Sequence, residues 1–357
     1  MDGHMDILDL TIDELARELE EIGIKRYRAD QIYEWLYRGV LDFDKMTNIS
    51  KEMRILLANH FRSKPLKILD KIEANDGSTR KYLFLLEDKN IIESVVMRYV
   101  YGNTICISTQ VGCKMGCDFC ASTKEGFIRH LTPGEMVAQV LEAEMDLGID
   151  GDARAIKNIV LMGSGEPLDN YENTLKFLNI VHEPLGLNMS YRNITLSTCG
   201  LVPRIYELSD ENIPITLSIS LHAPNDNIRQ QIMPIARVYS IDDVIEASKY
   251  YFKKTGRRVT FEYALIENIN DKKEHALELA KRLEGFPCHV NIIPVNKIRD
   301  SQYVRSDERN INRFMDILEA YNLQVTRRRE LGHNIQGACG QLRRDYLSRY
   351  MSNFKEE

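Results

Sequence analysis

The sequence predicts an α/β protein, an incomplete (β/α) barrel of six units preceded by a small helical domain and a β-ribbon. Three observations lead to this prediction. The first 63 residues show helical periodicity, the next segment alternates as strands do, and from about residue 104 apolar strands alternate with helices. Such alternation is typical of parallel strands joined by right-handed crossovers. The expected parts are a helical domain (1–63), a ribbon linker (64–100), a core that ends in a C-terminal loop (101–340) and a terminal helix (341–357).

Three amphipathic segments predict the helices of the N-terminal domain. An apolar stripe runs from Leu8 to Ile22, and Thr11-Ile-Asp-Glu has the pattern of a capping box near its start. The second segment runs from Arg28 to Tyr37, and the third from Ser50 to Phe61. Strands are then predicted at 66–74, 79–86 and 91–99, joined by turns rich in Asn, Asp and Gly.

Six apolar segments predict the strands of the core, and polar residues gather just after them, where barrel enzymes place their chemistry. The expected strands are Thr104–Gln110, Asn158–Met162, Arg192–Ser197, Ile215–Ser220, Val259–Leu265 and Val290–Pro294. The expected helices between them include Pro133–Leu147, Ile241–Lys254, Lys272–Leu283 and Glu308–Tyr321.

Composition excludes several classes of protein. No apolar run is long enough to span a membrane, and the N-terminus lacks the layout of a secretory signal. Seven cysteines, an odd number, argue against a disulfide framework and for a reducing cytoplasm, where we expect the protein to act. The net charge of −6 gives no global attraction to nucleic acid, so local basic clusters must decide that question.

Three cysteines, Cys113, Cys117 and Cys120, are spaced Cys-x-x-x-Cys-x-x-Cys, with Phe119 before the third. Three thiolates can hold three corners of a four-iron cluster and leave one iron open, whereas electron-transfer clusters of this size take four cysteines. A closed zinc site, usually built from four ligands, and a set of buried thiols are the alternatives. The flanking glycines fit a loop that wraps closely around an inorganic core, which favours the cluster.

Polar groups follow the expected strands. Gly163-Ser-Gly-Glu-Pro167 follows the second strand, where its glycines would let the backbone approach a ligand and Glu166 could accept from an ammonium group. Ser220 and His222 follow the fourth strand and could bind a carboxylate or a ribose, and Asn296 follows the sixth. A tight turn with a solvated Glu and a structural His are the plainer readings of these segments taken singly.

Two further cysteines suggest thiol chemistry. Cys339 lies in Gly337-Ala-Cys-Gly340, whose glycines favour an exposed sulfur over a buried one, and Cys106 lies seven residues before the cluster motif. Cys199 and Cys288 have no such context and are interpreted as structural.

The combination of segments resembles one family along essentially the whole chain, the radical SAM RNA adenine methyltransferases of the RlmN/Cfr type. The family methylates adenosine in RNA, at carbon 2 in 23S rRNA and tRNA for RlmN-type enzymes and at carbon 8 for Cfr-type enzymes. Asn291-Ile-Ile-Pro-Val-Asn296 looks more like RlmN. The segments that carry the resemblance are Ile105–Cys113, the cluster motif, Gly163–Pro167, Thr195–Thr198, Ser220–Asp226 and Ala338–Leu342.

The resemblance implies a radical SAM barrel and a role for each matching residue. Cys113, Cys117 and Cys120 would bind a [4Fe–4S] cluster. Cys339 would take a methyl group from one S-adenosylmethionine (SAM), and a second SAM would give the radical that activates this methyl. Cys106 would resolve the protein–RNA adduct and leave a Cys106–Cys339 disulfide. Glu93 matches the position of a residue that is assigned as proton acceptor in this family, although Cys106 is the better base for the mechanism. The implied SAM-binding residues are Gly165, Glu166, Ser197, Ser220, Leu221, His222 and Asn296.

The resemblance also implies partners. These are 23S rRNA and tRNA as substrates and a flavodoxin- or ferredoxin-type electron donor, and we expect a monomer. Arginine clusters at 257–258, 327–329 and 343–344, and Arg26, Tyr27 and Arg28, are candidate RNA contacts, although solvated surface charge is the usual role of such pairs. The chain departs from the family at Ser164, often Met, and at Asn334-Ile-Gln-Gly337, often Asp-Ile-x-Ala.

Two rival functions are compatible with parts of the sequence. Another type of radical SAM enzyme would need the cluster but neither Cys106 nor Cys339. A non-catalytic RNA-binding protein would carry a closed, four-ligand metal site and would have no affinity for SAM.

Overall fold

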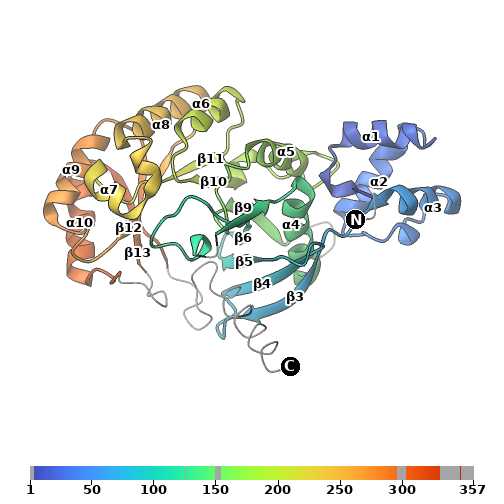
Figure 1. Cartoon of the computed structure of the whole chain (residues 1–357), viewed down its shortest axis with the longest axis horizontal. Coiled ribbons are helices and arrows are strands. Elements are labelled where there is room, and N and C mark those ends of the chain that lie inside the picture. The colour runs from blue at the N-terminus through green and yellow to red at the C-terminus, as the bar shows by residue number, and fades with distance from the viewer. Residues whose placement is uncertain (1–3, 125, 149–153, 296–302, 330–345, 347–357) are drawn as a thin grey trace.

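The computed structural model describes residues 4–124, 126–148, 154–295, 303–329 and 346. In Figure 1 the N-terminal helices α1 (Ile12–Glu21), α2 (Arg28–Tyr37) and α3 (Lys51–His60) lie at one end of the molecule. The barrel helices α8 (Ile241–Thr255), α9 (Lys273–Leu283) and α10 (Glu308–Ala320) lie at the other end. The sheet runs between the two ends.

Within the described residues, one sheet of ten strands forms the body of the protein. It has three antiparallel pairings at one side, from β3 to β6, followed by a run of parallel strands. In spatial order its strands are β14 (Gln324–Arg327), β13 (His289–Pro294), β12 (Thr260–Leu265), β11 (Thr216–Ser220), β10 (Ile194–Thr198), β9 (Ile156–Leu161), β6 (Gly102–Cys106), β5 (Ile91–Tyr99), β4 (Thr79–Leu86) and β3 (Leu66–Glu73).

The expected α/β partial barrel is therefore confirmed. Its helices are α4 (Pro133–Leu147), α5 (Tyr171–His182), α6 (Val202–Asp210) and α7 (Asp226–Ile232), followed by α8 to α10. The described edge strands β3 and β14 do not pair with each other, so the barrel is open. The ribbon strands continue the barrel sheet, because β5 pairs with β6 in antiparallel register.

Local sequence signals explain the starts of the helices. Thr11 accepts from the amide of Glu14, whose carboxylate bonds back to Thr11, so the predicted capping box is formed. Thr132 and Glu135 make the same box at the start of α4. The N-terminal region is tied to the barrel there, since Asp9 Oδ1 accepts from the backbone N–H of Gly134 at 2.7 Å. A short parallel pair, β1 (Met5–Asp6) with β2 (Phe61–Arg62), closes this region.

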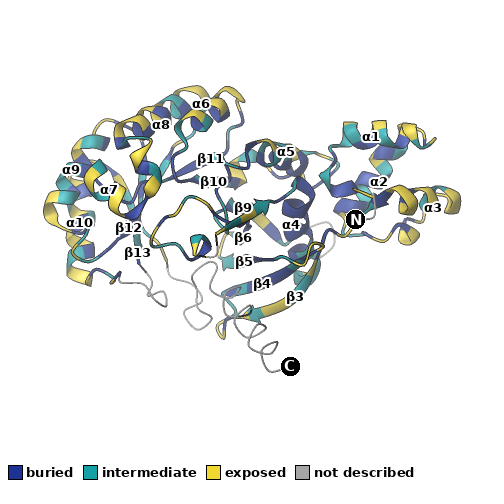
Figure 2. Cartoon of the chain, viewed as in Figure 1, coloured by how far each residue is buried: buried dark blue, intermediate teal, exposed yellow. Residues whose placement is uncertain are grey.

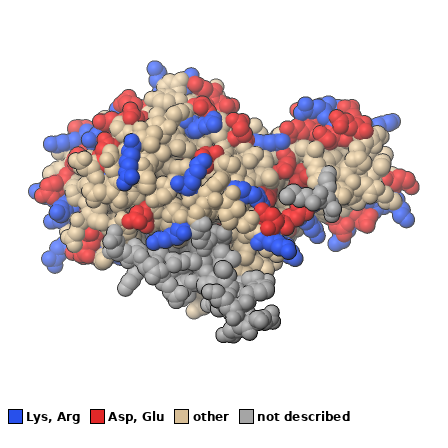
Figure 3. Space-filling view, in the orientation of Figure 1, with Lys and Arg blue, Asp and Glu red and all other residues tan. Residues whose placement is uncertain are grey.

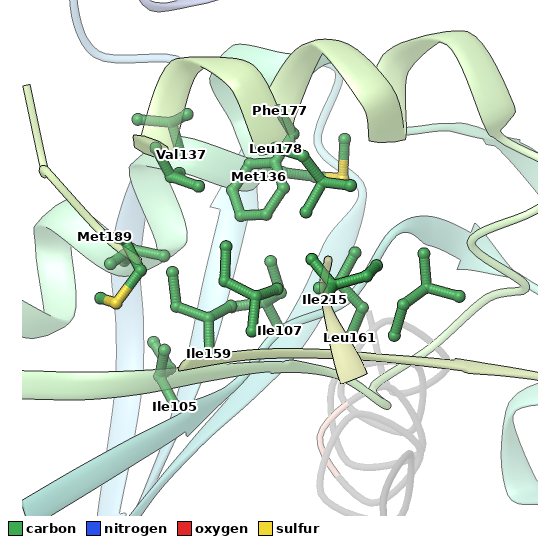
Figure 4. Close-up of a cluster of buried hydrophobic side chains, with 14 of the residues drawn as sticks. Ile105, Ile107, Met136, Val137, Ile159, Leu161, Phe177, Leu178, Met189 and Ile215 are labelled. Atoms are coloured by element: carbon green, nitrogen blue, oxygen red, sulfur yellow. The ribbon is translucent and has the colours of Figure 1, made fainter. Parts of the chain in front are cut away.

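The outer face of the sheet is apolar and is covered by helices. In Figure 4, Met136 and Val137 of α4 and Phe177 and Leu178 of α5 pack over Ile159 and its neighbours from the strands. Figure 2 shows the same layering, with buried residues concentrated in the sheet and the exposed ones on the outer sides of the helices. We call the opposite side of the sheet the inner face. Because side chains alternate along a strand, Cys106, Ser197, Ser218, Glu262 and Asn291 lie on it.

Two parts of the sequence prediction differ from the structure. The segment Thr104–Gln110 is not one strand, because β6 ends at Cys106 and a separate hairpin, β7 (Gln110–Gly112) with β8 (Phe127–His130), follows. The break occurs because Thr109 and Gln110 turn their N–H groups to Ser164 O. Strand β14 was not expected.

In the described part of the chain, no helix combines the length and apolarity needed to cross a bilayer.

Candidate active site

The three motif cysteines lie in one loop, which connects β7 to β8. Gly112 precedes it with a φ of +76°, and a Cβ there would come within 1.8 Å of Gly126 O, so only glycine fits. The turn is held by backbone bonds from Cys120 N to Cys117 O at 3.0 Å and from Cys113 N to Gly126 O at 3.2 Å. This brings all three thiols to the carboxyl ends of the parallel strands.

The environment of these thiols is apolar. Cys113 and Cys117 are buried and Cys120 is half-buried, and Cys117 packs with Cys199, Ile232 and Met233. Burial raises the pKa of Cys113 to about 12 and that of Cys117 further, and the negative charge of Cys120 adds to both shifts. Three neighbouring thiols in such apolar surroundings become thiolates only when a positively charged group binds them.

The glycine-rich turn after β9 packs against protein backbone. A Cβ on Gly163 would lie 2.6 Å from Ile107 O, and one on Gly165, whose φ is +113°, would lie 2.7 Å from Gln110 Cβ. Ser164 O accepts from Thr109 N at 2.8 Å. These glycines therefore join β9 to the segment that leads into the cluster loop, a role that the sequence alone did not indicate.

Glu166 is buried rather than solvated. One carboxylate oxygen accepts from Cys199 N at 2.8 Å and the other from Leu168 N at 3.1 Å, while its own N–H donates to Gln110 Oε1. Burial raises the pKa of this carboxyl, and the hydrogen bonds oppose the shift. The side chain thus fixes the end of β10 next to the turn after β9.

The segment after β11 places His222 over the cluster loop. His222 has a left-handed φ of +56°, and its ring packs edge-on to Phe119, with centroids 4.9 Å apart. Burial, together with the Arg229 cation, lowers the pKa of His222 to about 3, so the ring is neutral. Because Nδ1 accepts from Ala264 N at 2.9 Å, the proton lies on Nε2, which becomes a donor.

Cys106 and Glu93 share the inner face on adjacent strands. Cys106 pairs with Val95 across β5 and β6, and Glu93 is the next β5 residue on that face. Ser94, which lies between Glu93 and Val95 in β5, points to the opposite, helix-covered face, where its hydroxyl donates to Gln139 of α4 at 2.7 Å. Buried Lys81 of β4 pairs with Val95 from the other side and so lies in the same row. Both predicted residues are therefore close to the end of β6.

Two family models match the chain. The model of the radical SAM superfamily covers residues 107–280, and that of the ribosomal RNA large subunit methyltransferase N-terminal domain covers residues 5–62. A crystal structure of a radical SAM methyltransferase from Sphaerobacter thermophilus has a TM-score of 0.90 and 45% identity, over 94% of this chain and 98% of that one.

Curated relatives match over the full length. A probable dual-specificity RNA methyltransferase RlmN from Clostridium tetani is 52% identical over 352 residues, which make up 99% of each chain. That of Alkaliphilus oremlandii is 51% identical over 343 residues, 96% of this chain and 98% of the relative. The chain belongs to the RlmN family. It is a radical SAM methyltransferase, and both the predicted fold family and the predicted enzyme class are confirmed.

The cofactors of this RlmN-family enzyme are a [4Fe–4S] cluster and SAM. Among the described residues, no three His, Cys, Asp or Glu side chains converge as the ligands of a single ion would. A four-iron cluster makes a different demand, since it holds each thiolate on a separate iron. The loop of Cys113, Cys117 and Cys120, with its apolar surroundings and mutually interacting thiols, fits such a cluster.

Some predicted residues of the RlmN-type site lie outside the described residues. These are Asn296, Cys339, the segment 334–337 and the arginines 343–344. Ser197, Ser220 and Leu221 are described, and they lie at or just after the ends of β10 and β11. No disulfide joins two of the described cysteines.

Sequence reasoning missed two residues of the site. Cys199, interpreted as structural, contacts Cys117, and its backbone N–H binds Glu166. Arg229 is completely buried behind the strand ends. The only sequence signal for Arg229 was its spacing of three residues from Ile232, which places both on the inward side of α7.

The arginine clusters differ in their surroundings. Arg257 and Arg258 precede β12 and so lie at the end of the barrel opposite the cluster loop. Arg327 pairs with Glu308 at 2.6 Å, whereas Arg328 and Arg329 are exposed. Acidic and basic side chains are interspersed over the face in Figure 3, so any RNA contact there depends on local charge.

Proposed function

We propose that this enzyme methylates carbon 2 of adenosine in 23S rRNA and tRNA through an S-methylated Cys339. The observation that carries the proposal is the full-length similarity to dual-specificity RNA methyltransferases, at 52% identity for the C. tetani relative. Cys106 also supports the proposal. It lies on the inner face at the end of β6, next to the strand ends where a thiol would have to act to release the RNA from Cys339. Carbon 2 of adenine has no nucleophilic lone pair, so polar transfer from SAM fails there.

Cofactor binding is assigned to the strand ends. Cys113, Cys117 and Cys120 would hold the cluster, whose reduced form supplies the electron for radical chemistry when SAM is bound. His222, with its Nε2 donor, is suited to a carboxylate or ribose oxygen of SAM. The remaining proposed SAM contacts are Gly165, Glu166, Ser197, Ser220, Leu221 and Asn296.

The two thiols have different tasks. Cys339 carries the carbon that is added to the ring, and it needs thiolate character to accept that methyl group. Cys106 takes the proton from carbon 2 of the adduct. After losing that proton again, its sulfur attacks the sulfur of Cys339, the bond from that sulfur to the methylene carbon breaks, and the carbon keeps the electron pair and takes up a proton to become the methyl group. The RNA is thereby released, and a Cys106–Cys339 disulfide remains. Glu93, on the same face, is the second candidate for the base.

Substrate binding would use the N-terminal helices and the barrel opening together. Exposed Tyr27 has the guanidinium of Arg28 over its ring at 5.0 Å, an arrangement on which an unpaired base can stack. The target adenosine must be flipped to reach the inner face. We also propose a monomer that acts in the cytoplasm, where its RNA substrates are, with a flavodoxin- or ferredoxin-type electron donor.

Product analysis tests the proposal. The chain is expressed in a host that lacks its own adenine-C2 methyltransferase. Nucleosides from 23S rRNA and tRNA are then separated by chromatography, which distinguishes the 2-methyl from the 8-methyl isomer, and identified by mass spectrometry. We expect 2-methyladenosine in both RNAs with the wild type and none with Cys339→Ala. Mainly 8-methyladenosine would assign the chain to Cfr-type chemistry, and unmodified RNA would refute the proposal.

A further inference from the structure

Arg229 is the largest fully buried side chain in the described part of the protein. It is the fourth residue of α7 and has 0% exposure. Removing a guanidinium from water is costly unless its N–H groups find partners. The cost of burying this cation must therefore be offset by partners inside the protein.

The partners of Arg229 are backbone carbonyls at the strand ends. Nη2 donates to Cys199 O at 2.7 Å and, more weakly, to Ser220 O at 3.5 Å, while Nε donates to Leu221 O at 3.3 Å. Nη1 donates to Tyr239 O at 3.4 Å. A Cβ on Gly200 would lie 3.2 Å from Nη2, so the small residue leaves room for the guanidinium. One side chain thus holds the segments after both β10 and β11.

The same helix also supports the cluster loop. Ile232 O, one turn after Arg229, accepts from Asp118 N at 3.0 Å, and the Cys199 side chain packs against Cys117. Among the described residues, no carboxylate forms an ion pair with Arg229, and the groups that act on it electrostatically are the sulfurs of Cys199 and Cys117 and the Asp226 carboxylate. A guanidinium stays protonated in proteins, so this is a permanent positive charge near the cluster loop.

We propose that Arg229 is a positioning residue that fixes the SAM-binding ends of β10 and β11 and favours the reduced state of the cluster through its positive charge. A cluster on three thiolates gains one negative charge on reduction. A buried cation nearby stabilises that charge more than it would in water. The inference rests on the cluster and SAM site of the proposed function but not on carbon-2 chemistry.

Two variants of Arg229 separate its two effects. Arg229→Met removes the charge and the hydrogen bonds, and Arg229→Lys keeps the charge but loses the planar set of donors. Arg154→Met is the matched control. Arg154 lies in the segment before β9 and also donates to backbone carbonyls, to Gly186 O at 2.6 Å and to Tyr37 O at 3.4 Å. Each protein is reconstituted anaerobically, and its reduction potential and its SAM dissociation constant are measured without RNA.

We expect Arg229→Met to bind SAM about tenfold more weakly. Its reduction should be about tenfold less favourable, equivalent to ~59 mV for one electron. Arg229→Lys should keep the potential and lose SAM affinity, and Arg154→Met should change neither. A wild-type potential or wild-type SAM affinity in Arg229→Met would overturn the proposal, as would equal losses in Arg154→Met. If the Met variant does not fold, unchanged SAM affinity in the Lys variant overturns it. A changed RNA product would bear only on the proposed function.

Discussion

On the outer face of the sheet, Ile105, Ile159 and Phe261 meet helices, and the contacts there are almost entirely apolar. On the inner face, the neighbouring residues of the same strands are Cys106, Val160 and Glu262, and the buried polar groups there bind one another. Because successive side chains of a strand point to opposite faces, the residues of the outer face form the apolar core and those of the inner face form the candidate active site. Changes at the site residues of the inner face should alter cofactor binding and products, changes on the outer face should alter the free energy of unfolding, and a buried carboxyl on the inner face should alter its pH dependence.

The largest expected effect is loss of the cluster. Cys117→Ala removes one of three ligands and should abolish iron and sulfide binding after anaerobic reconstitution, measured by metal analysis and the visible spectrum. Cys288→Ala is the control, because Cys288 is also buried but packs in the main apolar core. Full iron content in Cys117→Ala, or equal loss in the control, would contradict the assignment of the motif.

The next largest effect divides the two thiols. Cys339→Ala has no carbon to deliver and should give neither methylated RNA nor a covalent adduct. Cys106→Ala should still form the carbon bond but not release it, so RNA should accumulate on Cys339. Denaturing electrophoresis before and after nuclease treatment measures the adduct, and peptide mass spectrometry of the wild type should show a methyl group on Cys339. Absence of trapped RNA would remove the resolving role of Cys106.

A core change on the outer face should affect stability instead. Phe177 of α5 is fully buried over the sheet, and Phe177→Ala should lower the free energy of unfolding by about 3–5 kcal/mol. Urea denaturation measures this loss. The exposed Leu56→Ala in α3 should change it by about 0.5 kcal/mol or less. Iron content per folded molecule should stay unchanged in both, and a selective loss in Phe177→Ala would break the division between the faces.

The smallest effect is a change in pH dependence. Burial raises the pKa of Glu262, which accepts from Ser218 at 2.9 Å and from Asn291 at 3.0 Å. The native state therefore holds this proton more tightly than the unfolded state, so stability falls as pH rises from the ordinary carboxyl range through the raised pKa. Glu262→Gln lacks this loss and should gain stability relative to the wild type as pH increases.

Unfolding of the apo-protein across a pH series measures the difference. Exposed Glu246→Gln, in α8, should run parallel to the wild type at every pH. A constant offset between Glu262→Gln and the wild type would mean that Glu262 is charged throughout, and the inner face would then hold a buried carboxylate.

Much of the fold could be predicted because local signals agree with tertiary structure. Thr11, Ser50 and Ser240 accept from backbone amides at the predicted helix starts, and the hairpin turns define β3 to β5. Strand β14 was missed because Gln324–Arg327 is short and alternates weakly, so its pairing with β13 depends on the tertiary structure. The break after Cys106 was missed for the same reason, since the hydrogen bonds that cause it are accepted by Ser164 O, more than fifty residues away.

The site divides in a similar way. The cluster cysteines and Cys106 could be predicted because their chemistry is rare and their spacing is specific. Glu166 was expected to meet a ligand or solvent. It is buried away from solvent, and its carboxylate binds backbone amides whose positions no sequence pattern reveals, while its contact with SAM stays a proposal. Arg229 could not be identified, because its partners are carbonyls, which every residue has and which no sequence pattern reveals.

An open barrel leaves two sheet edges where strands of another molecule could add. Strand β3 lies at one edge, where Lys67, Asp70, Lys71 and Glu73 are exposed and a bulge separates Ile68 from Asp70. Charges and bulges of this kind oppose edge-to-edge pairing. At the other edge β14 is only four residues long and ends in an arginine. Both described edges of the sheet are thus strands that resist pairing with another molecule, so the barrel can stay open without forming extended sheets.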